Sequence, residues 1–303
     1  MSLEISHNEI YLLDQELWID TVGAKEYIST LNRSEKVKAA LFSLEENGFC
    51  VLKNLISKEV CDKIVEEFKS FLVSNCDESS YVDRYGLHDR LASFHLHTNT
   101  FQSLYNQPLL NEILSLLFCG QVAIFGSLFF ERGSEQDFHR DTPAFFTNPL
   151  GRYVGCWYAL EDIDETQGPL VYYLKSHRID SDYELRKIVR NSNEYQMLIN
   201  SKCVEKGLEQ KEFQANKGDV LIWHPQLVHR GKSRVNKSLS RYSAVIHMMA
   251  KNSLIHSPDD FFSGKMKLIP SNVPMTSRNG YECIDHGDPR FFYNRAEGNF
   301  DEF

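Results

Sequence analysis

The chain has 303 residues, of which 42% are hydrophobic and 25% are charged, so it can bury a large core and does not have the composition of a disordered protein. Its formal net charge of −9, without a long basic stripe, argues against a duplex nucleic-acid binder. Seven cysteines without a CxxC pair favour reduced thiols in a cytoplasmic protein, and neither a membrane span nor a signal-peptide pattern is expected.

The first part of the chain, about residues 1–120, predicts a helical preface with one strand. Gly48 is a typical C-terminal cap, Ser57 a typical N-cap, and Pro108 a typical first residue of a helix. These signals divide the apolar pattern into a helix over 36–47, a strand-like run over 49–56, and helices over 58–73 and 108–117.

From residue 121 onward the pattern changes to short β-type runs separated by turn signals such as Gln167-Gly168-Pro169. The expected strands lie within 122–130, 153–163, 170–177, 220–229 and 241–249. A charged insertion over 178–216 is long enough to form a lid, and the tail over 251–303 is expected to cover the outside of the core. We therefore predict a single, mostly β domain with flanking helices and a core over about 121–250.

A candidate pair of metal ligands lies in the stretch QDFHRDTPAFF. In a strand His139 and Asp141 would share one face, so an imidazole and a carboxylate could bind one ion. The pair is weak evidence alone, because a chain with eleven histidines contains such motifs by chance, and the two side chains could simply hydrogen-bond at a strand end. A second match, His286-Gly287-Asp288, has no histidine after it to supply a third ligand.

A third ligand is available in KGDVLIWHPQLVHRG, which offers His224 and His229. Two histidines and one carboxylate leave three positions of an octahedron open, which suits non-haem Fe(II), whereas zinc more often has a closed tetrahedral set. Only one of these two histidines can complete such a set, and His224, next to Pro225, is expected to be structural.

A possible carboxylate clamp follows at the start of the next expected strand. By alternation Arg241 and Ser243 share a face, where a guanidinium fork and a hydroxyl could receive a carboxylate. A surface salt bridge is the ordinary alternative, although the place of Arg241 beside an apolar strand favours a buried partner.

These stretches together resemble the phytanoyl-CoA dioxygenase family of Fe(II)- and 2-oxoglutarate-dependent oxygenases. The resemblance covers about residues 40–248. Its motifs are LEENGFCVLKNLISKEVCDKIVEEF, FHRDTPAFF, CWYALEDIDETQGPLVYYLKSH and KGDVLIWHPQLVHRG followed by RYS. The chain has Leu-Lys-Ser-His at 174–177 where the family usually has Pro-Gly-Ser/Thr-His, and its interval from His229 to Arg241 is one residue longer than usual.

The resemblance implies a double-stranded β-helix, a jelly roll of the cupin kind. It implies that His139, Asp141 and His229 hold the iron, that Arg241 pairs with the distal carboxylate of 2-oxoglutarate, and that Trp157 lies near this cosubstrate. The implied reaction consumes O₂ and 2-oxoglutarate, releases succinate and CO₂, and oxidises a C–H bond of a small molecule. Family members that halogenate replace the carboxylate with a small residue, so Asp141 favours hydroxylation or another oxidation such as desaturation.

Further residues are candidates for the substrate pocket, each with an ordinary alternative. Aromatic residues here are at least as often core residues as pocket wall, alternating histidines often only hydrogen-bond locally, and arginines are usually exposed. The candidates are Phe129, Phe145, Phe146, His95, His97 and Arg152.

Two other functions use the same motifs. A cupin-like hydrolase or isomerase could use the triad without 2-oxoglutarate, but it would not require the carboxylate clamp. A catalytically silent relative could act as a binding protein, although an intact triad argues against it. The sequence favours an enzyme acting on a small molecule, with no nucleic-acid or membrane partner, and it does not specify an oligomeric state.

Overall fold

The computed structural model describes residues 17–75, 82–148, 150–263, 274–278 and 280–292. Residues 1–16 of the expected preface, and 264–273 and 293–303 of the expected tail, lie outside the described residues. No helix among those described combines the length and the apolar composition needed to cross a membrane.

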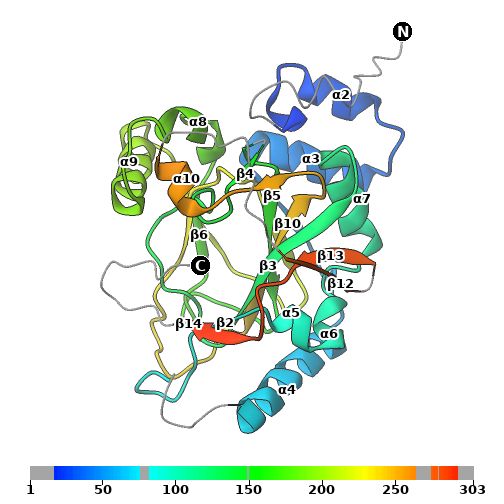
Figure 1. The fold of residues 1–303 in the computed structure, drawn as a ribbon, viewed down its shortest axis with the longest axis vertical. Helices are drawn as coiled ribbons and strands as arrows, with labels where there is room; N and C mark the ends of the chain where they lie inside the picture. The colour runs from blue at the N-terminus through cyan, green and yellow to red at the C-terminus, as the bar shows by residue number, and fades with distance from the viewer. Residues whose placement is uncertain (1–16, 76–81, 149, 264–273, 279, 293–303) are drawn as a thin grey trace.

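A large, almost entirely antiparallel sheet forms the centre of the protein (Figure 1). Its main path runs β1-β8-β5-β10-β3-β13-β12, and β2 pairs with both β3 and β14. The strands are β1 (Phe49–Leu52), β2 (Arg90–Ala92), β3 (Val122–Phe130), β5 (Tyr153–Ala159), β8 (Val220–Trp223), β10 (Ser243–Ala250), β12 (Met275–Arg278), β13 (Tyr281–Ile284) and β14 (Arg290–Phe292).

A second, three-stranded antiparallel sheet has the order β7-β6-β9. It consists of β6 (Leu170–Tyr173), β7 (Gln210–Phe213) and β9 (His229–Gly231), and a separate pair joins β4 (Thr147–Asn148) to β11 (Leu254–Ile255). One apolar cluster contains Trp157 and Val245 of the large sheet together with Leu170 and Phe213 of the small one, so this core lies between the two sheets. Two sheets packed in this way bear out the predicted β core of the jelly-roll kind.

Helices cover the other face of the large sheet. Ala244 and Ile246 of β10 belong to a core cluster with Leu41 and Phe68 of the helices, whereas Val245 belongs to the core between the sheets. This division follows from the period of two in a strand. The N-terminal helices are η1 (Trp18–Asp20), α2 (Ala24–Thr30), α3 (Glu35–Asn47), α4 (Lys58–Asn75), α5 (Phe94–His97), α6 (Asn99–Gln102) and α7 (Pro108–Leu117).

The helix boundaries follow the capping residues of the sequence. Gly48 ends α3 with φ 82°, in the left-handed region that glycine adopts without strain. The Ser57 hydroxyl accepts a hydrogen bond from the Val60 amide in the first turn of α4, and α7 begins at Pro108.

The insertion and the tail meet on one side of the molecule. Figure 1 shows α8 (Asp182–Leu185), α9 (Ser192–Glu205) and α10 (Pro258–Phe262) together there, and Leu185, Tyr195 and Phe261 share one apolar cluster. The short helix η2 (Ser176–Arg178) precedes them. The described part of the tail does more than cover the outside, because β12, β13 and β14 extend the large sheet and α10 packs on the insertion.

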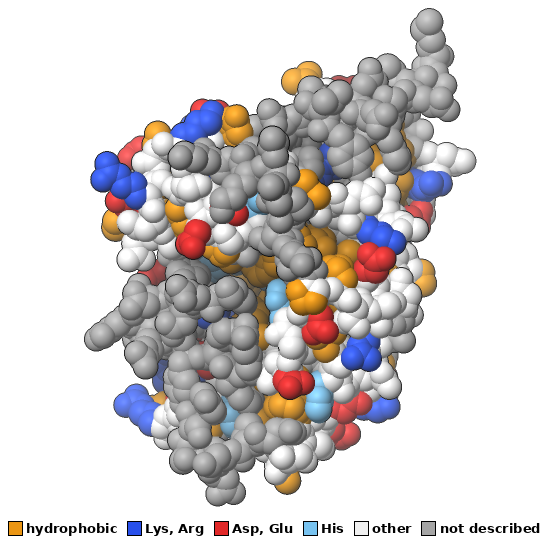
Figure 2. All heavy atoms as spheres, viewed as in Figure 1, with side chains coloured by type: hydrophobic (Ala, Val, Ile, Leu, Met, Phe, Trp, Pro, Cys, Tyr) orange, Lys and Arg blue, Asp and Glu red, His pale blue; other side chains and the backbone are white. Residues whose placement is uncertain are grey.

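Figure 2 shows apolar side chains near the centre of this face, with charged side chains beside them and toward the edges. Many charged side chains form ion pairs, such as Lys187 with Glu184 and Lys251 with Glu282. Exposed pairs of this kind contribute little to stability, so the burial of apolar side chains between the layers is the dominant stabilising term.

One turn is built on a glycine that has no room for a side chain. Gly218 has φ +92°, and a Cβ atom there would lie 2.2 Å from the Ile56 carbonyl oxygen. Gly207 also has positive φ, at +62°, but nothing lies within 4 Å of its Cβ position. We expect Gly207→Ala to lower the free energy of unfolding by about 1 kcal/mol, the cost of the backbone conformation alone. Gly218→Ala should cost roughly 3 kcal/mol or more because backbone atoms must also move.

Urea denaturation of the two alanine variants measures this difference directly. Equal losses of stability in both variants would contradict the expectation, since only Gly218 has backbone against its Cβ position.

Candidate metal and cosubstrate site

Three residues from two segments form a possible metal-binding group between the sheets. His139, Asp141 and His229 are all buried, and each offers one ligand atom within 4.8 Å of the others. His229 is the first residue of β9, and its main chain exchanges two hydrogen bonds of 3.0 Å with that of His139. This bridge fixes the spacing of the two imidazoles, and Asp141 follows two residues later.

Both histidines are oriented by main-chain carbonyl groups. His139 Nδ1 lies 2.7 Å from the Asp137 carbonyl oxygen, and His229 Nδ1 lies 3.0 Å from that of Leu227. Because only a protonated nitrogen can donate to a carbonyl, the Nε2 atoms carry the free lone pairs. These atoms lie 3.5 Å and 3.8 Å from Asp141 Oδ1. Burial lowers the pKa of His229 to about 4, which keeps its imidazole neutral and able to bind a metal.

The Asp141 carboxylate uses its two oxygens differently. Its Oδ2 atom accepts hydrogen bonds from Trp223 Nε1 at 3.0 Å and His247 Nε2 at 3.1 Å, so Oδ1 is left toward the two ligand histidines. Burial opposes ionisation, but His229 and His247 hold the pKa of Asp141 well below its usual range. The donor set is therefore two imidazoles and one ionised carboxylate, which is suited to Fe(II).

The indole of Trp223 needs a glycine beneath it. Gly155 lies on the neighbouring strand β5, and a Cβ atom there would lie 2.1 Å from Trp223 Cε2. The absence of a side chain at Gly155 thus gives the indole the space from which its Nε1–H reaches Asp141.

Removing the Trp223 hydrogen bond is expected to weaken the metal site. We expect Trp223→Phe to lower the Fe(II) affinity by about tenfold or more, because the carboxylate loses one of the two donors that orient it. Trp18→Phe is the matched control, since Trp18 donates to the Leu116 carbonyl, outside the site. Anaerobic Fe(II) titration of both variants checks this, and an unchanged affinity in Trp223→Phe would contradict it.

A pocket beside the triad contains a buried guanidinium group. Arg241, just before β10, lines it together with the three ligand residues and Trp157, and its Cζ atom lies 5.4 Å from the Trp157 ring centroid. The side chain is 3% exposed, and its Nε atom has no hydrogen-bond partner among the described residues. Burial lowers the pKa of Arg241 to about 10, so the group stays charged at neutral pH. A buried cation with an unused donor is a site for an anionic ligand.

Ser243 is also buried. By strand alternation it lies on the same face of β10 as Val245 and His247, which line the pocket. Its hydroxyl lies 3.4 Å from the Arg241 carbonyl oxygen, and Ser243 is not part of the pocket lining. The structure therefore brings Arg241 and Trp157 to the triad and leaves Ser243 beside them.

A larger cavity of about 470 Å³ opens on the other side of the triad. His139, Asp141 and Gln136 border both the cavity and the Arg241 pocket. The outer wall comes from the insertion and the tail, with Gln196 on α9 and Phe262 on α10. Phe145, a candidate from the sequence, lines this cavity and stacks on the His247 ring with a centroid distance of 3.6 Å.

Two predicted aromatic residues lie elsewhere. Phe129 stacks on Phe68 of α4 at 4.3 Å, because strand alternation directs it to the helix-covered face while Leu128 and Phe130 face the Arg241 pocket. Phe146 packs in the apolar cluster with Phe261, at a centroid distance of 5.6 Å. The prediction that these two residues line the pocket was wrong.

Three polar candidates are also outside both cavities. His95 and His97 lie on helix α5 and not on a strand; His95 bonds Ser127 at 2.6 Å, and His97 packs edge-on against Phe71 at 4.8 Å. Arg152 is buried near β4 and lines neither cavity. Their positions follow from local helix formation and core packing, which the alternating pattern did not reveal.

His224 of the KGDVLIWHPQLVHRG stretch and His286 of the second His-x-Asp match bond groups outside the triad. His224 Nε2 bonds Asp20 Oδ2 at 2.9 Å, in agreement with a structural role. His286 Nε2 lies 2.7 Å from the Phe125 carbonyl oxygen, so it does not join the triad.

Sequence reasoning missed the two donors to Asp141. His247 follows Arg241, Ser243 and Val245 at alternate positions, a signal that could have found it. A β-bulge lies opposite, where His247 pairs with Gly126 and Met248 with Ile124. Trp223 carries no such signal, because its role depends on the space above Gly155.

Comparison with known proteins agrees with this geometry. The model of the family described as phytanoyl-CoA dioxygenase matches residues 44–242. The chain belongs to the phytanoyl-CoA dioxygenase family. Phytanoyl-CoA dioxygenase domain-containing protein 1 of Danio rerio is 26% identical over 183 residues, which are 58% of this chain and 62% of that protein. The peroxisomal phytanoyl-CoA dioxygenase of Mus musculus is 27% identical over 212 residues, 61% of this chain and 60% of that protein. The match therefore spans about three fifths of each of these relatives.

Solved structures show that the fold is shared more widely. The non-heme alpha-ketoglutarate-dependent carbocyclase SnoK from nogalamycin biosynthesis superposes with a TM-score of 0.60 at 16% identity, covering 79% of this chain and 93% of that one. EctD from S. alaskensis, solved with 2-oxoglutarate and 5-hydroxyectoine, superposes with a TM-score of 0.56 at 15% identity, covering 75% and 79%. At these identities the likeness concerns the fold alone.

Proposed function

We propose that this member of the phytanoyl-CoA dioxygenase family is an Fe(II)- and 2-oxoglutarate-dependent oxygenase that hydroxylates, or otherwise oxidises, an unactivated C–H bond of a small molecule. The observation that carries the proposal is one pocket with an intact two-histidine, one-carboxylate set and a buried guanidinium. Bound Fe(II), 2-oxoglutarate and O₂ would supply the oxidation, with release of succinate and CO₂.

The residues of the chain perform the binding and the positioning. The Nε2 atoms of His139 and His229 and the Oδ1 atom of Asp141 would hold the metal. Arg241 would receive the distal carboxylate of 2-oxoglutarate, since it is a buried cation whose Nε atom has no hydrogen-bond partner among the described residues. Trp157 forms the wall beneath this guanidinium and excludes water from the pair.

The larger cavity is the proposed substrate site because the metal ligands lie in its wall. Its volume of about 470 Å³ is within the range of small-molecule sites. Its lining combines apolar groups such as Phe145 and Phe262 with the amides of Gln136 and Gln196. Support comes from EctD, which was solved with the small molecule 5-hydroxyectoine. Asp141 fills the third ligand position with a carboxylate, which favours hydroxylation or desaturation over halogenation.

A hydrolase or isomerase of the cupin kind would use the triad alone. Such chemistry leaves the buried charge of Arg241 without a role, and its desolvation is costly because the Nε atom has no hydrogen-bond partner in the part of the chain that the structure describes. A silent binding protein would not need the orienting bonds of Trp223 and His247 to Asp141. The oxygenase uses all of these features.

Anaerobic titration of metal-free protein with Fe(II), and then with 2-oxoglutarate, tests the proposal. We expect a visible charge-transfer band that forms only after 2-oxoglutarate is added, followed by succinate production when air is admitted. Iron binding without the band would reject 2-oxoglutarate as cosubstrate, and failure to bind iron would reject the metal site itself.

A further inference from the structure

Arg241 lies at the end of a loop, residues 232–240, that connects β9 to β10 and is held by a second buried arginine. Arg234 is 3% exposed although it lies in the loop, and it makes four side-chain hydrogen bonds there and nearby. Its Nη1 atom donates to the carbonyl oxygens of Lys237 at 2.9 Å and Leu239 at 3.0 Å. One guanidinium thus closes the loop on itself immediately before Arg241.

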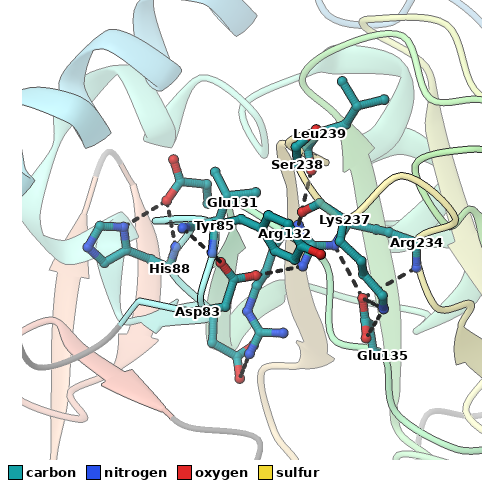
Figure 3. Close-up of polar contacts among 12 residues, drawn as sticks. Asp83, Tyr85, His88, Glu131, Arg132, Glu135, Arg234, Lys237, Ser238 and Leu239 are labelled. Carbon is teal, nitrogen blue, oxygen red and sulfur yellow. Dashed lines mark hydrogen bonds and ion pairs between the residues drawn. The ribbon is translucent and has the colours of Figure 1, made fainter.

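The other donors of Arg234 bind two carboxylates outside the loop (Figure 3). Nη2 donates to Asp83 Oδ2 at 2.8 Å, and Nε donates to Glu135 Oε1 at 3.2 Å. Glu135 also accepts two bonds of 2.9 Å from Lys237 Nζ. Burial would raise the pKa of Glu135, but these bonds from Lys237 and Arg234 lower it, so the carboxylate is ionised at neutral pH.

The turn over residues 131–135 contacts both arginines. At its start the Glu131 carbonyl accepts the Arg241 amide at 2.6 Å, and at its end Glu135 binds Arg234. Between them Gly133, with φ +79°, lies so close that a Cβ atom would be 2.7 Å from Arg241 Cδ and 2.8 Å from Nη1. The turn therefore supports the clamp side chain directly, and Arg234 is bonded to the other end of the same turn.

The start of the turn is fixed by a separate set of contacts, of which Figure 3 shows those between Glu131 and His88. Glu131 Oε2 accepts the main-chain amide and the Nδ1 of His88, each at 2.7 Å, and Oε1 accepts the Tyr242 hydroxyl at 2.9 Å. Because Glu131 is held in this way, the contacts of Arg234 fix the position of Glu135 at the other end of the turn and the position of the 232–240 loop.

We propose that Arg234 is a positioning residue for the cosubstrate clamp, acting through the 131–135 turn and the 232–240 loop on the place of the Arg241 guanidinium. The inference rests on the proposed function, because it assigns Arg234 to the binding of the distal carboxylate of 2-oxoglutarate. Hydrogen bonds depend steeply on distance and angle, so a small displacement of the guanidinium removes much of the binding free energy that it contributes.

The test compares two keto acids in Arg234→Lys, which keeps the charge but cannot reproduce the fork of bonds. 2-Oxopentanoate has the keto acid that chelates iron but lacks the distal carboxylate. We expect the anaerobic Fe(II) charge-transfer titration to show roughly tenfold weaker binding of 2-oxoglutarate in the variant. The affinities for Fe(II) and for 2-oxopentanoate should stay close to wild type.

Two further variants separate positioning from general stability. Arg186→Lys is the matched control, since Arg186 is also a buried arginine and donates to the Phe261 and Asp260 carbonyls, away from Arg241; it should lose thermal stability without losing 2-oxoglutarate affinity. If Arg234→Lys does not fold, Glu135→Gln weakens the same contacts and should shift the affinity in the same direction.

The possible outcomes have different consequences. Equal weakening of both keto acids in Arg234→Lys, or no weakening of 2-oxoglutarate, would overturn the positioning role. A wild-type protein that gives no band with either keto acid would overturn the proposed function and, with it, this inference.

Discussion

Replacing His229 with alanine is expected to abolish iron-dependent turnover. The variant removes one of the three ligand atoms, together with an imidazole that packs between His139 and Trp223 with its ring centroid 4.5 Å from each. Loss of a metal that contributes several kcal/mol of transition-state stabilisation predicts a rate at least on the order of 10³-fold lower. Fe(II) titration and succinate release together measure the two losses.

His224→Ala is the control for this prediction. His224 lies five positions before His229 in the same motif, and its Nε2 atom bonds Asp20 Oδ2 at 2.9 Å outside the site. We expect the variant to lose stability, because a buried pair is broken, and to keep the wild-type Fe(II) affinity. If His224→Ala lost iron and His229→Ala kept it, the ligand assignment would be wrong.

Replacing Arg241 with alanine is expected to remove the preference for 2-oxoglutarate. Truncating one partner of a buried charged pair costs about 2–5 kcal/mol, which corresponds to a Kd for 2-oxoglutarate that is ~30-fold weaker or more. Iron affinity should be close to that of wild type, since Arg241 is not one of the three residues that offer a ligand atom. The charge-transfer band of the Fe(II) protein measures both affinities.

The chemical control uses 2-oxopentanoate, which offers no carboxylate to the guanidinium. Wild type should bind 2-oxoglutarate much more tightly than 2-oxopentanoate, and Arg241→Ala should bind the two almost equally. Arg241→Lys should show a preference for 2-oxoglutarate that is weaker than in wild type and stronger than in Arg241→Ala, because an ammonium keeps the charge but cannot form the paired bonds of a guanidinium. A variant that still prefers 2-oxoglutarate would show that another group binds the distal carboxylate.

The residues with a chemical signature could be found without coordinates. His139 and Asp141 are two positions apart and Arg241 begins an apolar run, so strand alternation indicated them as candidates, and the resemblance to the family joined them with His229 in one site. Capping chemistry likewise placed the ends of α3 and α7. These signals come from residues that are close together in the sequence, where the period of the helix or strand determines the direction in which each side chain points.

Strand alternation did not predict which face of a strand lies toward the pocket. Phe129 has Leu128 and Phe130 as neighbours, and all three are apolar, so the sequence does not indicate which one faces the pocket. In β3 both faces are buried, one by helices and one by the second sheet, and an apolar residue suits either.

The donor types of the site can be read from the sequence, because imidazole, carboxylate and guanidinium groups bring their chemistry wherever they lie. Their orientation depends on the folded chain. Asp141 is held by Trp223 and His247, which lie 82 and 106 residues away, and Arg241 by a turn that begins at Glu131. Contacts over such distances depend on the packing of whole strands and on the space left at Gly155 and Gly133, which no local pattern encodes.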